Sequence, residues 1–284
     1  ITDGADDIFN GSPALFVVKG TVLYACGANE MGSLGAGDTA NKATLTQVKT
    51  SVDVKKIKSM RYYDGSNVTA LTFLHSGNKV FGAGKNGYNQ IIAADTNNKS
   101  VFTEITDNMG GSIVCSDGSD FAIGLFTNIL LVPNGGNTDL WVAGCGEDGY
   151  GDSASQGTNN KRRKIATLVG TGWKCECPII GYGSGSMRSS FFIYNEERKE
   201  IKAFGFNSES GILGIGDIAE KVRGIMDLTL PKSNSQFEVS FGWMKAYGSY
   251  ICVIADGTLY ATGSQKSGML LGTYTQLNPV VSSM

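Results

Sequence analysis

The segment Gly20–Asp38, with the sequence GTVLYACGANEMGSLGAGD, decides the fold. It begins with a short apolar strand, Val22–Cys26, which Gly27 closes. A stretch rich in glycine and polar residues follows and ends in the sequence Leu-Gly-Ala-Gly-Asp at residues 34–38. This order predicts a β-strand that leaves its sheet at a glycine and continues into a tight loop.

Weaker copies of this segment recur along the chain. Each copy has a glycine in the position of Gly27, which we call the marker glycine. The marker glycines are Gly27, Gly84, Gly144, Gly205 and Gly263. They are separated by 57, 60, 61 and 58 residues, and a period this regular indicates a repeat architecture.

Further short apolar strands surround each marker strand. The predicted hairpins before it are residues 8–9 with 14–18, 57–60 with 68–73, 113–115 with 121–125, 179–180 with 191–194, and 244–249 followed by 250–254. The predicted strands after it include residues 45–48, 102–105, 165–169 and 276–281. No segment has a sustained helical period with caps at both ends, so little helix is expected.

Four short antiparallel strands in each of five repeats predict an all-β fold, a five-bladed β-propeller. We expect a single domain over residues 1–284, with repeats of about 58 residues at 1–52, 53–109, 110–172, 173–237 and 238–284. Residues 6–18 supply a strand pair that the segment at 279–281 lacks. The two termini are therefore predicted to share one blade.

Composition limits the classes of partner. The 284 residues include 39 glycines, nearly twice the usual share of about 7%, as many tight turns require. The net charge of −2 offers no electrostatic footprint for nucleic acid. The longest apolar run, Phe121–Val132, is interrupted at Thr127 and predicts a hairpin, so no membrane insertion is expected.

Residues that could support catalysis or metal binding are few. His75 is the one histidine and lies at a strand-to-turn junction, where a structural role is expected. Cys175 and Cys177 are too close in sequence for a disulfide or a zinc motif, and buried thiols are the favoured interpretation of the six cysteines. We therefore expect no cofactor, no metal and no enzymatic activity.

Two charged segments have structural interpretations. Lys161–Lys164 is a compact basic run that we expect at a solvated loop tip, with an acidic partner as the alternative. The loop Asp95–Asn98 has oxygen ligands that suit calcium but lacks the spacing of a known calcium loop.

The marker segments resemble the regulator of chromosome condensation repeat. In the first repeat the matching residues are Tyr24, Gly27, Asn29, Gly32, Leu34, Gly35, Gly37 and Asp38. In the fourth they are Gly205, Asn207, Gly211, Leu213, Gly214, Gly216 and Asp217, and in the fifth Asp256, Gly257, Tyr260, Gly263, Gly268, Leu271 and Gly272. The family's tryptophan before the marker glycine is absent, and its usual seven repeats are five here. The resemblance implies a propeller and, as one functional option, guanine-nucleotide exchange on a small GTPase.

Each motif residue has a predicted structural role. The glycines allow a positive φ and close backbone approach, the leucine packs between blades, and the closing aspartate caps turn amides.

Tyrosine and arginine side chains at the turns between the first two strands of each repeat are the candidate partner-binding residues. They are Arg61, Tyr62, Tyr63, Tyr182, Arg188 and Tyr247, with Met187 beside Arg188. Packing around the propeller axis is an equal alternative for these side chains.

The leading hypothesis is a non-enzymatic module that recognises a protein or a cell-surface macromolecule through loops on one face. The loops rich in Asn, Ser, Thr and Gly, the few prolines and a first residue other than Met favour a virion or extracellular surface, as in a phage tail-associated, receptor-binding structural protein within a larger assembly. The alternatives are a cytoplasmic exchange factor, as the family resemblance implies, and a secreted enzyme inhibitor.

Overall fold

The computed structural model describes residues 5–11, 14–63, 68–92, 94–145, 159–177, 179–183, 186–207, 213–216, 221–228, 237–244, 248–255, 258–263 and 274–279. Almost all regular structure in these ranges is β. The helical segment that they contain is one 3₁₀ turn, η1 (Glu30–Gly32). Within the same ranges, no helix has the length and apolar character needed to span a membrane.

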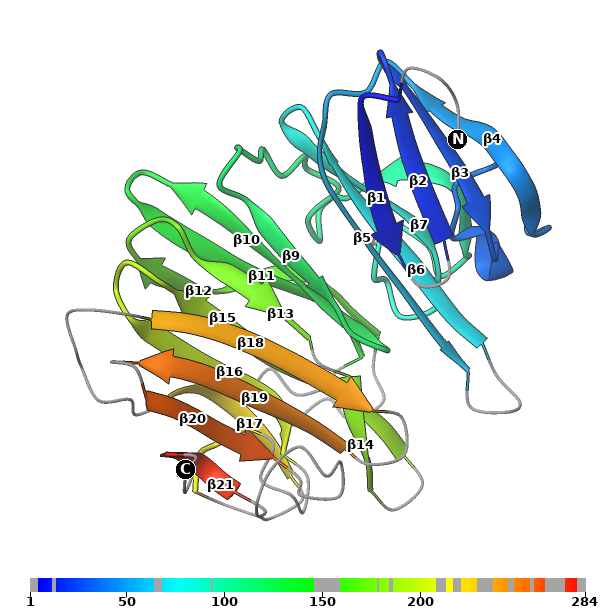
Figure 1. The fold of residues 1–284 in the computed structure, drawn as a ribbon. Coiled ribbons are helices and arrows are strands. Elements are labelled where there is room, and N and C mark those ends of the chain that lie inside the picture. The colour runs from blue at the N-terminus through cyan, green and yellow to red at the C-terminus, as the bar shows by residue number, and fades with distance from the viewer. Residues whose placement is uncertain are drawn as a thin grey trace. The chain divides into compact units, whose positions relative to one another are not determined.

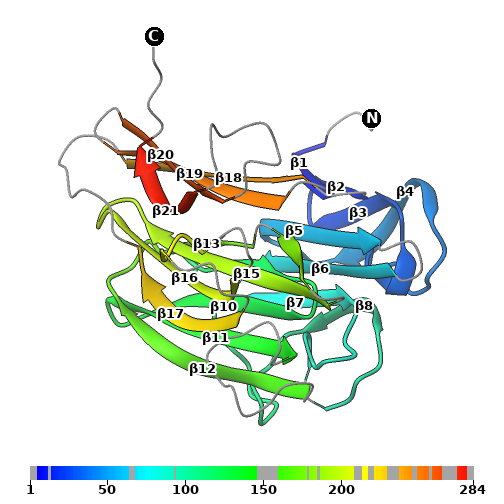
Figure 2. The same ribbon diagram turned by 90° about the horizontal axis from the view of Figure 1, so that it is seen from below.

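The first compact unit contains the described residues up to 144 and those from 159 to 171. It holds three four-stranded sheets, each built from strands consecutive in the chain (Figures 1 and 2). The first sheet is β1 (Asp7–Gly11), β2 (Ala14–Lys19), β3 (Val22–Gly27) and β4 (Lys42–Thr50). The second is β5 (Val54–Tyr63), β6 (Val68–Ser76), β7 (Lys79–Gly84) and β8 (Lys99–Glu104). The third is β9 (Asp120–Ile123), β10 (Thr127–Asn134), β11 (Asn137–Cys145) and β12 (Asn159–Val169).

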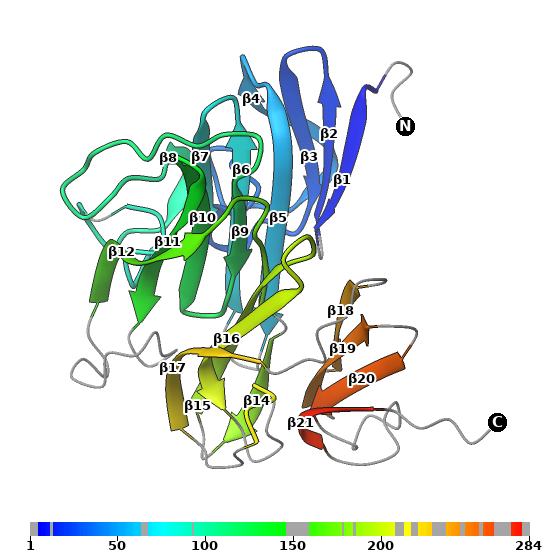
Figure 3. The same ribbon diagram turned by 90° about the vertical axis from the view of Figure 1, so that its left-hand side faces the viewer.

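The second compact unit contains the described residues from 172 onward and holds two sheets (Figure 3). The fourth sheet is β13 (Lys174–Glu176), β14 (Ile179–Gly183), β15 (Ser186–Asn195), β16 (Glu200–Asn207) and β17 (Lys221–Asp227), in which β13 and β14 both pair with β15. The fifth is β18 (Phe237–Met244), β19 (Gly248–Ala255), β20 (Thr258–Gly263) and β21 (Tyr274–Pro279).

The prediction of an all-β chain of short antiparallel strands is confirmed. The marker strands β3, β7, β11 and β20 are each the third strand of their sheet. In the fourth sheet the marker strand is β16, which follows β15. The hairpins predicted before the marker strands form in the first and second repeats, as β1–β2 and β5–β6. In the fourth repeat Ile179 pairs with Ser189, and residues 192–194 pair with β13. In the fifth repeat the first strand is β18, which ends at Met244 and so precedes most of the predicted segment 244–249.

The marker glycines have the backbone geometry that the sequence predicts. Gly84 has a φ of 111° and Gly144 a φ of 123°, in the region that favours glycine. A Cβ at Gly84 would overlap the carbonyl oxygen of Ala70, and one at Gly144 would overlap that of Phe126. The marker strand therefore passes close to its neighbour in the sheet as it ends.

Apolar side chains fill the space between neighbouring sheets of each compact unit. In the first unit, Phe16, Leu23 and Leu34 pack with Ile57 and Leu74 of the second sheet. The predicted packing of the motif leucine between sheets is thus confirmed for Leu34. The second and third sheets meet at an edge-to-face pair of Phe73 and Phe121, and the second unit has its own core around Phe192 and Val253.

The third repeat departs from the prediction. Ile113–Cys115 is not a strand; the first strand is β9 and the second is β10. A tight turn, in which the amide of Gly124 donates to the carbonyl of Thr127, folds Phe121–Val132 on itself and forms the hairpin predicted there. Because Ile113 and Cys115 are buried and Val114 is exposed, the segment 113–115 has the alternation of a strand without strand pairing.

Two further predictions are wrong. Among the described residues the termini do not share a sheet: β1 pairs with β2 in the first sheet, and β21 pairs with β20 in the fifth. Residues 280 and 281 of the predicted segment lie outside the described residues. The short connection between β1 and β2 lets these strands pair locally, without a distant partner. The basic run Lys161–Lys164 is not a loop tip, because it lies within β12, and the side chain of Arg162 is buried.

Candidate interaction surface

A buried asparagine braces the loop that follows the first marker strand. The Asn29 side chain is fully buried. Its Oδ1 accepts a hydrogen bond from the amide of Leu34 at 2.8 Å, and its Nδ2 donates to the carbonyls of Asp38 and Ala40 at 2.9 and 3.1 Å. The Asn29 amide in turn donates to Oδ1 of Asn41 at 2.9 Å. The loop between β3 and β4 is therefore fixed from inside.

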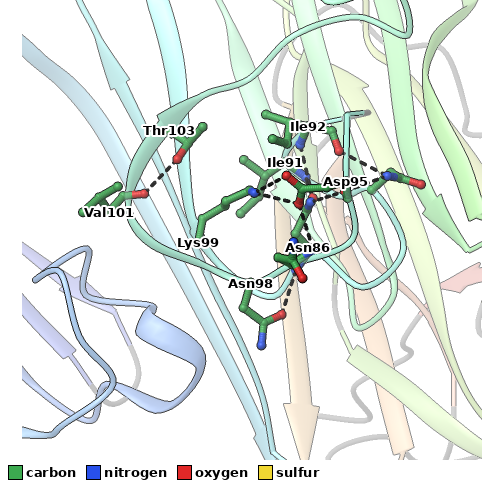
Figure 4. A network of polar contacts seen from close by, with 10 residues as sticks. Asn86, Ile91, Ile92, Asp95, Asn98, Lys99, Val101 and Thr103 are labelled. Carbon is green, nitrogen blue, oxygen red and sulfur yellow. Dashed lines mark hydrogen bonds and ion pairs between the residues drawn. The ribbon is translucent and has the colours of Figure 1, made fainter.

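The same brace recurs 57 residues later, at Asn86 (Figure 4). Its Oδ1 accepts from the amides of Ile91 and Ile92 at 2.8 and 3.2 Å, and its Nδ2 donates to the carbonyl of Asp95 at 2.7 Å. Asn98 accepts from the Asn86 amide, as Asn41 does from Asn29. In the fourth repeat, Asn207 accepts from the amide of Leu213 at 3.2 Å. The motif asparagines thus have a structural role.

The closing aspartates cap these loops, as predicted. Oδ1 of Asp38 accepts from the amide of Ala40 at 3.0 Å, and Oδ1 of Asp95 accepts from the amide of Asn97 at 2.8 Å. Lys99 forms an ion pair with Asp95 at 2.7 Å, and its hydrogen bond lowers the pKa of that carboxyl group. The carboxylate that a calcium ion would use is therefore occupied by the lysine.

The structure describes two of the predicted partner-binding side chains. Arg61, on β5, donates from Nη2 to Oε1 of Glu30 at 2.6 Å and from Nε at 3.2 Å. This hydrogen bond lowers the pKa of Glu30. Tyr62 is only 9% exposed, so its ring packs inside the protein. The structure thus favours packing, the alternative that the sequence left open, for Tyr62, while Arg61 is half-buried in an ion pair with Glu30.

For the other predicted partner-binding residues, the structure describes the backbone of three and leaves one outside the described ranges. Tyr63 is the last residue of β5, and Tyr182 and Arg188 flank the β14–β15 turn. Met187 pairs with Tyr182 across that turn. Tyr247 lies outside the described residues. The predicted position beside turns between the first two strands is thus correct for Tyr63, Tyr182 and Arg188.

The connection from β8 to β9 presents apolar side chains that the sequence analysis did not single out. We call residues 105–115 the Met109 loop. Met109 is 88% exposed and Val114 is 66% exposed. An Asp-Asn-Met-Gly-Gly sequence at 107–111 was the available signal, because aspartate and glycine at this spacing favour a tight turn.

The tip of the Met109 loop is held by its own hydrogen bonds. Oδ1 of Asp107 accepts from the amides of Met109 and Gly111 at 2.8 and 2.7 Å. The Asp107 amide donates to the carbonyl of Gly111 at 2.9 Å. Met109 is therefore displayed at a turn whose backbone is fixed.

The base of the Met109 loop is tied to the second sheet. The Cys115 amide donates to the carbonyl of Asn78 at 2.8 Å. Ser112 donates from its hydroxyl to Glu104 at 2.5 Å, and Lys79 forms an ion pair with Glu104 at 2.7 Å. Ile105 and Ile113, at the two ends of the loop, are buried. The base of the loop is consequently joined to the second sheet by hydrogen bonds at Ser112 and Cys115.

The Met109 loop and the predicted Tyr63 turn lie at opposite ends of the second sheet. β5 and β6 are joined beyond the pair Tyr63 and Val68. β8 ends at Glu104, beside Lys79 at the start of β7, at the other end of the sheet. The second sheet therefore presents two distinct candidate surfaces.

Charged side chains on β5 and β9 form ion pairs between the second and third sheets. Asp120, nearly buried on β9, forms ion pairs with Lys56 at 2.7 Å and Lys58 at 3.3 Å on β5. These pairs fix the third sheet against the second. His75 is buried on β6, and its burial lowers the pKa of the imidazole, in agreement with a structural role.

The thiols offer little reactivity. Cys115 and Cys175 are buried and form no disulfide, as the favoured interpretation predicts, whereas Cys26, Cys177 and Cys252 are only half-buried. Burial raises the pKa of Cys115 to about 11. A thiol with so high a pKa is a poor nucleophile at neutral pH. Within the described ranges, the acidic, cysteine and histidine side chains form no cluster able to hold a metal ion.

Comparison with known proteins supports the fold. No family model matches the chain. The crystal structure of human WBSCR16 is similar, with a TM-score of 0.62 at 13% sequence identity. The match covers 94% of this chain and 65% of the WBSCR16 chain, so this chain spans about two thirds of that one. The chain thus has an all-β, propeller-like fold of antiparallel sheets, several of them four-stranded.

Proposed function

We propose that residues 1–284 form one five-bladed β-propeller that recognises another macromolecule and carries out no catalysis. Five successive antiparallel sheets, one for each sequence repeat, support this blade count. The inter-sheet packing of Leu34, which follows the marker strand of one repeat and contacts the sheet of the next, is the kind of contact a propeller repeats around its axis.

The observation that carries the recognition proposal is the rigid display of Met109. A fully exposed methionine on a flexible loop would lose side-chain and backbone entropy when it is bound. Here the backbone is already fixed by Asp107, so much of that cost is removed. Methionine is enriched at protein interfaces because its unbranched, polarisable side chain adapts to apolar pockets. We therefore assign the partner contact to the Met109 loop, with an apolar pocket on a protein partner as its complement.

The turn that carries Tyr63 in the first compact unit, and the turn that carries Tyr182 and Arg188 in the second, are further candidate surfaces, each within its own unit. They are favoured by residue type alone, because tyrosine and arginine often anchor interfaces. Arg61 contributes less to such a surface, since its guanidinium group is already paired with Glu30.

A virion or extracellular setting, such as a phage tail, is the proposed location, on the strength of the polar loop composition. Guanine-nucleotide exchange in the cytoplasm is the alternative that the repeat motif around Leu34 and Asp38 favours. The inhibitor hypothesis has no residue that distinguishes it from general surface recognition.

Site-specific photo-crosslinking tests the proposal. A benzophenone side chain is placed at Met109 and, in a control, at Ile8, which is 49% exposed on β1. The crosslinked protein is identified and purified, and its affinity is measured by calorimetry. We expect crosslinking at position 109 alone, and a loss of affinity of about tenfold or more in Met109→Ser, the effect of an interface hot spot.

Equal affinity of Met109→Ser, Ile8→Ser and the wild type would contradict the assignment. Accelerated nucleotide release from a purified small GTPase, unaffected by Met109→Ser, would support the exchange factor in its place.

A further inference from the structure

Arg162 is a buried cation that neither the fold nor the proposed function explains. It lies on β12 within the basic run, and its side chain is 1% exposed. Lys164, on the same strand, keeps 47% of its side chain exposed and forms an ion pair with Asp139 at 3.4 Å. Arg162 is therefore buried, whereas Lys164 of the same run reaches solvent.

Neutral acceptors satisfy only one nitrogen of the guanidinium group. Nη2 of Arg162 donates to the carbonyl of Gln90 at 2.7 Å and to Oδ1 of Asn128 at 2.6 Å. Asn128 also donates to the Gln90 carbonyl, at 3.0 Å. The Phe73 ring lies 6.0 Å from Cζ of Arg162. These contacts place the group between the second and third sheets.

Three donors of Arg162 and Gln90 are buried without an acceptor. Nε and Nη1 of Arg162 are buried without a hydrogen-bond partner. Nε2 of Gln90, the residue whose carbonyl holds Arg162, is likewise buried without a partner. A buried donor without an acceptor is costly, and a buried charge without a counter-charge is costlier.

No carboxylate among the described residues forms an ion pair with Arg162. The titratable group that acts on Arg162 is the Cys115 thiol, whose pKa is raised to about 11 by burial. A thiol with that pKa is neutral at pH 7 and cannot serve as the counter-charge. Burial also lowers the pKa of Arg162 to about 9, as expected for a guanidinium group removed from water with no carboxylate paired to it among the described residues.

A comparison of the second and third repeats shows that the fold does not require an arginine at the position of Arg162. Asn98-Lys99 precedes Ser100 in the second repeat, and Asn160-Lys161 precedes Arg162 in the third. Ser100 packs against the preceding repeat through its backbone: its carbonyl accepts from the amide of Gly37 at 2.8 Å. A small neutral residue thus meets the packing requirement at this position.

We propose that Arg162 binds a small inorganic anion of the chloride class in the interior between the second and third sheets. Nε and Nη1 of Arg162 donate to the anion, and Nε2 of Gln90 is the candidate third donor. A water molecule could accept these hydrogen bonds but would leave the positive charge uncompensated, whereas a halide does both. The bound anion then ties β12 to the loop after β7 and makes the stability of the first compact unit depend on the anion.

Thermal unfolding in sodium chloride and in sodium gluconate, at equal ionic strength and pH 7, tests the site. With chloride raised to 100 times its Kd, the wild-type Tm is expected to exceed the value in gluconate by about 5 °C. Arg162→Met, which keeps an unbranched apolar stem and removes the charge, should show no difference between the two salts. Lys164→Met is the matched control on the same strand and should keep the wild-type response.

Equal wild-type Tm values in the two salts, or an unchanged response in Arg162→Met, would overturn the proposal. A crystal grown in bromide provides a readout that does not depend on a variant. An anomalous peak within hydrogen-bond distance of Arg162 Nε or Nη1 is expected. A water molecule or a carboxylate found there would show that the donors are satisfied without an anion.

Discussion

At the scale of single residues, the motif positions are explained by hydrogen bonding inside the chain. Asn29 and Asn86 each satisfy amides and carbonyls of a loop that has no strand partner. Because buried backbone polar groups must be paired, one asparagine replaces several ladder hydrogen bonds. Asparagine recurs at this position because each of these loops needs the same hydrogen bonds.

Removal of one such brace should destabilise the protein strongly. Asn86→Ala leaves the Ile91 amide and the Asp95 carbonyl without partners, and we expect a loss of about 3 kcal/mol in the free energy of unfolding, measured by urea denaturation. Asn97→Ala is the matched control, since Asn97 is exposed in the same loop and uses its backbone amide. Equal stabilities of the two variants would contradict the brace.

Tyr62 distinguishes packing from recognition. Because its ring is buried, Tyr62→Ala should cost about 3 kcal/mol of stability, whereas Tyr62→Phe should cost far less. Chemical denaturation measures both. A Tyr62→Ala variant of wild-type stability that has lost partner binding would instead make Tyr62 a contact residue.

His75 predicts a pH dependence. Burial lowers its pKa below the value of 6.5 that an exposed histidine has, so the unfolded chain binds the proton more readily. The contribution of neutral His75 to the free energy of unfolding is fully present above pH 6.5. It is lost as the pH falls from 6.5 to the pKa in the folded protein, by about 1.4 kcal/mol for each pH unit between the two values. Unfolding curves of the wild type and His75→Gln between pH 7.5 and 5 test this. A constant difference between them would contradict it.

At the scale of elements, the marker strands are set by a glycine that no other residue can replace without strain. At Gly84 the φ is positive and a Cβ would overlap the Ala70 carbonyl, whereas Gly77 has a positive φ and open space around it. Gly84→Ala should therefore cost about 3 kcal/mol or more, and Gly77→Ala about 1 kcal/mol. Urea denaturation of the two variants checks the difference, and equal costs would show that the overlap relaxes.

The sequence was sufficient to predict most elements, because each strand is short, apolar and bounded by a turn. It failed where contacts with distant residues decide the outcome. Ile113–Cys115 alternates like a strand, but its backbone pairs with Asn78 and not with a strand. The burial of Arg162 depends on Gln90 and Asn128, which lie 72 and 34 residues away.

The candidate site was predicted less well than the fold. Residue type drew attention to Tyr62 and Arg61, yet one is buried and the other is paired within the protein. Exposure of Met109 follows from the Asp107 turn, and the sequence contains that turn without indicating which side chain faces solvent.

At the scale of the whole molecule, the proposals require one closed ring of five sheets. Inter-sheet packing of Leu34 and the ion pairs of Asp120 join neighbouring sheets within the first compact unit. A ring repeats such contacts until the last sheet meets the first, which gives the Met109 loop and the turn after Tyr63 separate faces for recognition.

Small-angle X-ray scattering of the purified chain tests that ring most directly. One compact domain of 284 residues should have a radius of gyration of about 19 Å, independent of protein concentration. A clearly larger value, with the scattering profile of two tethered bodies, would contradict the single propeller.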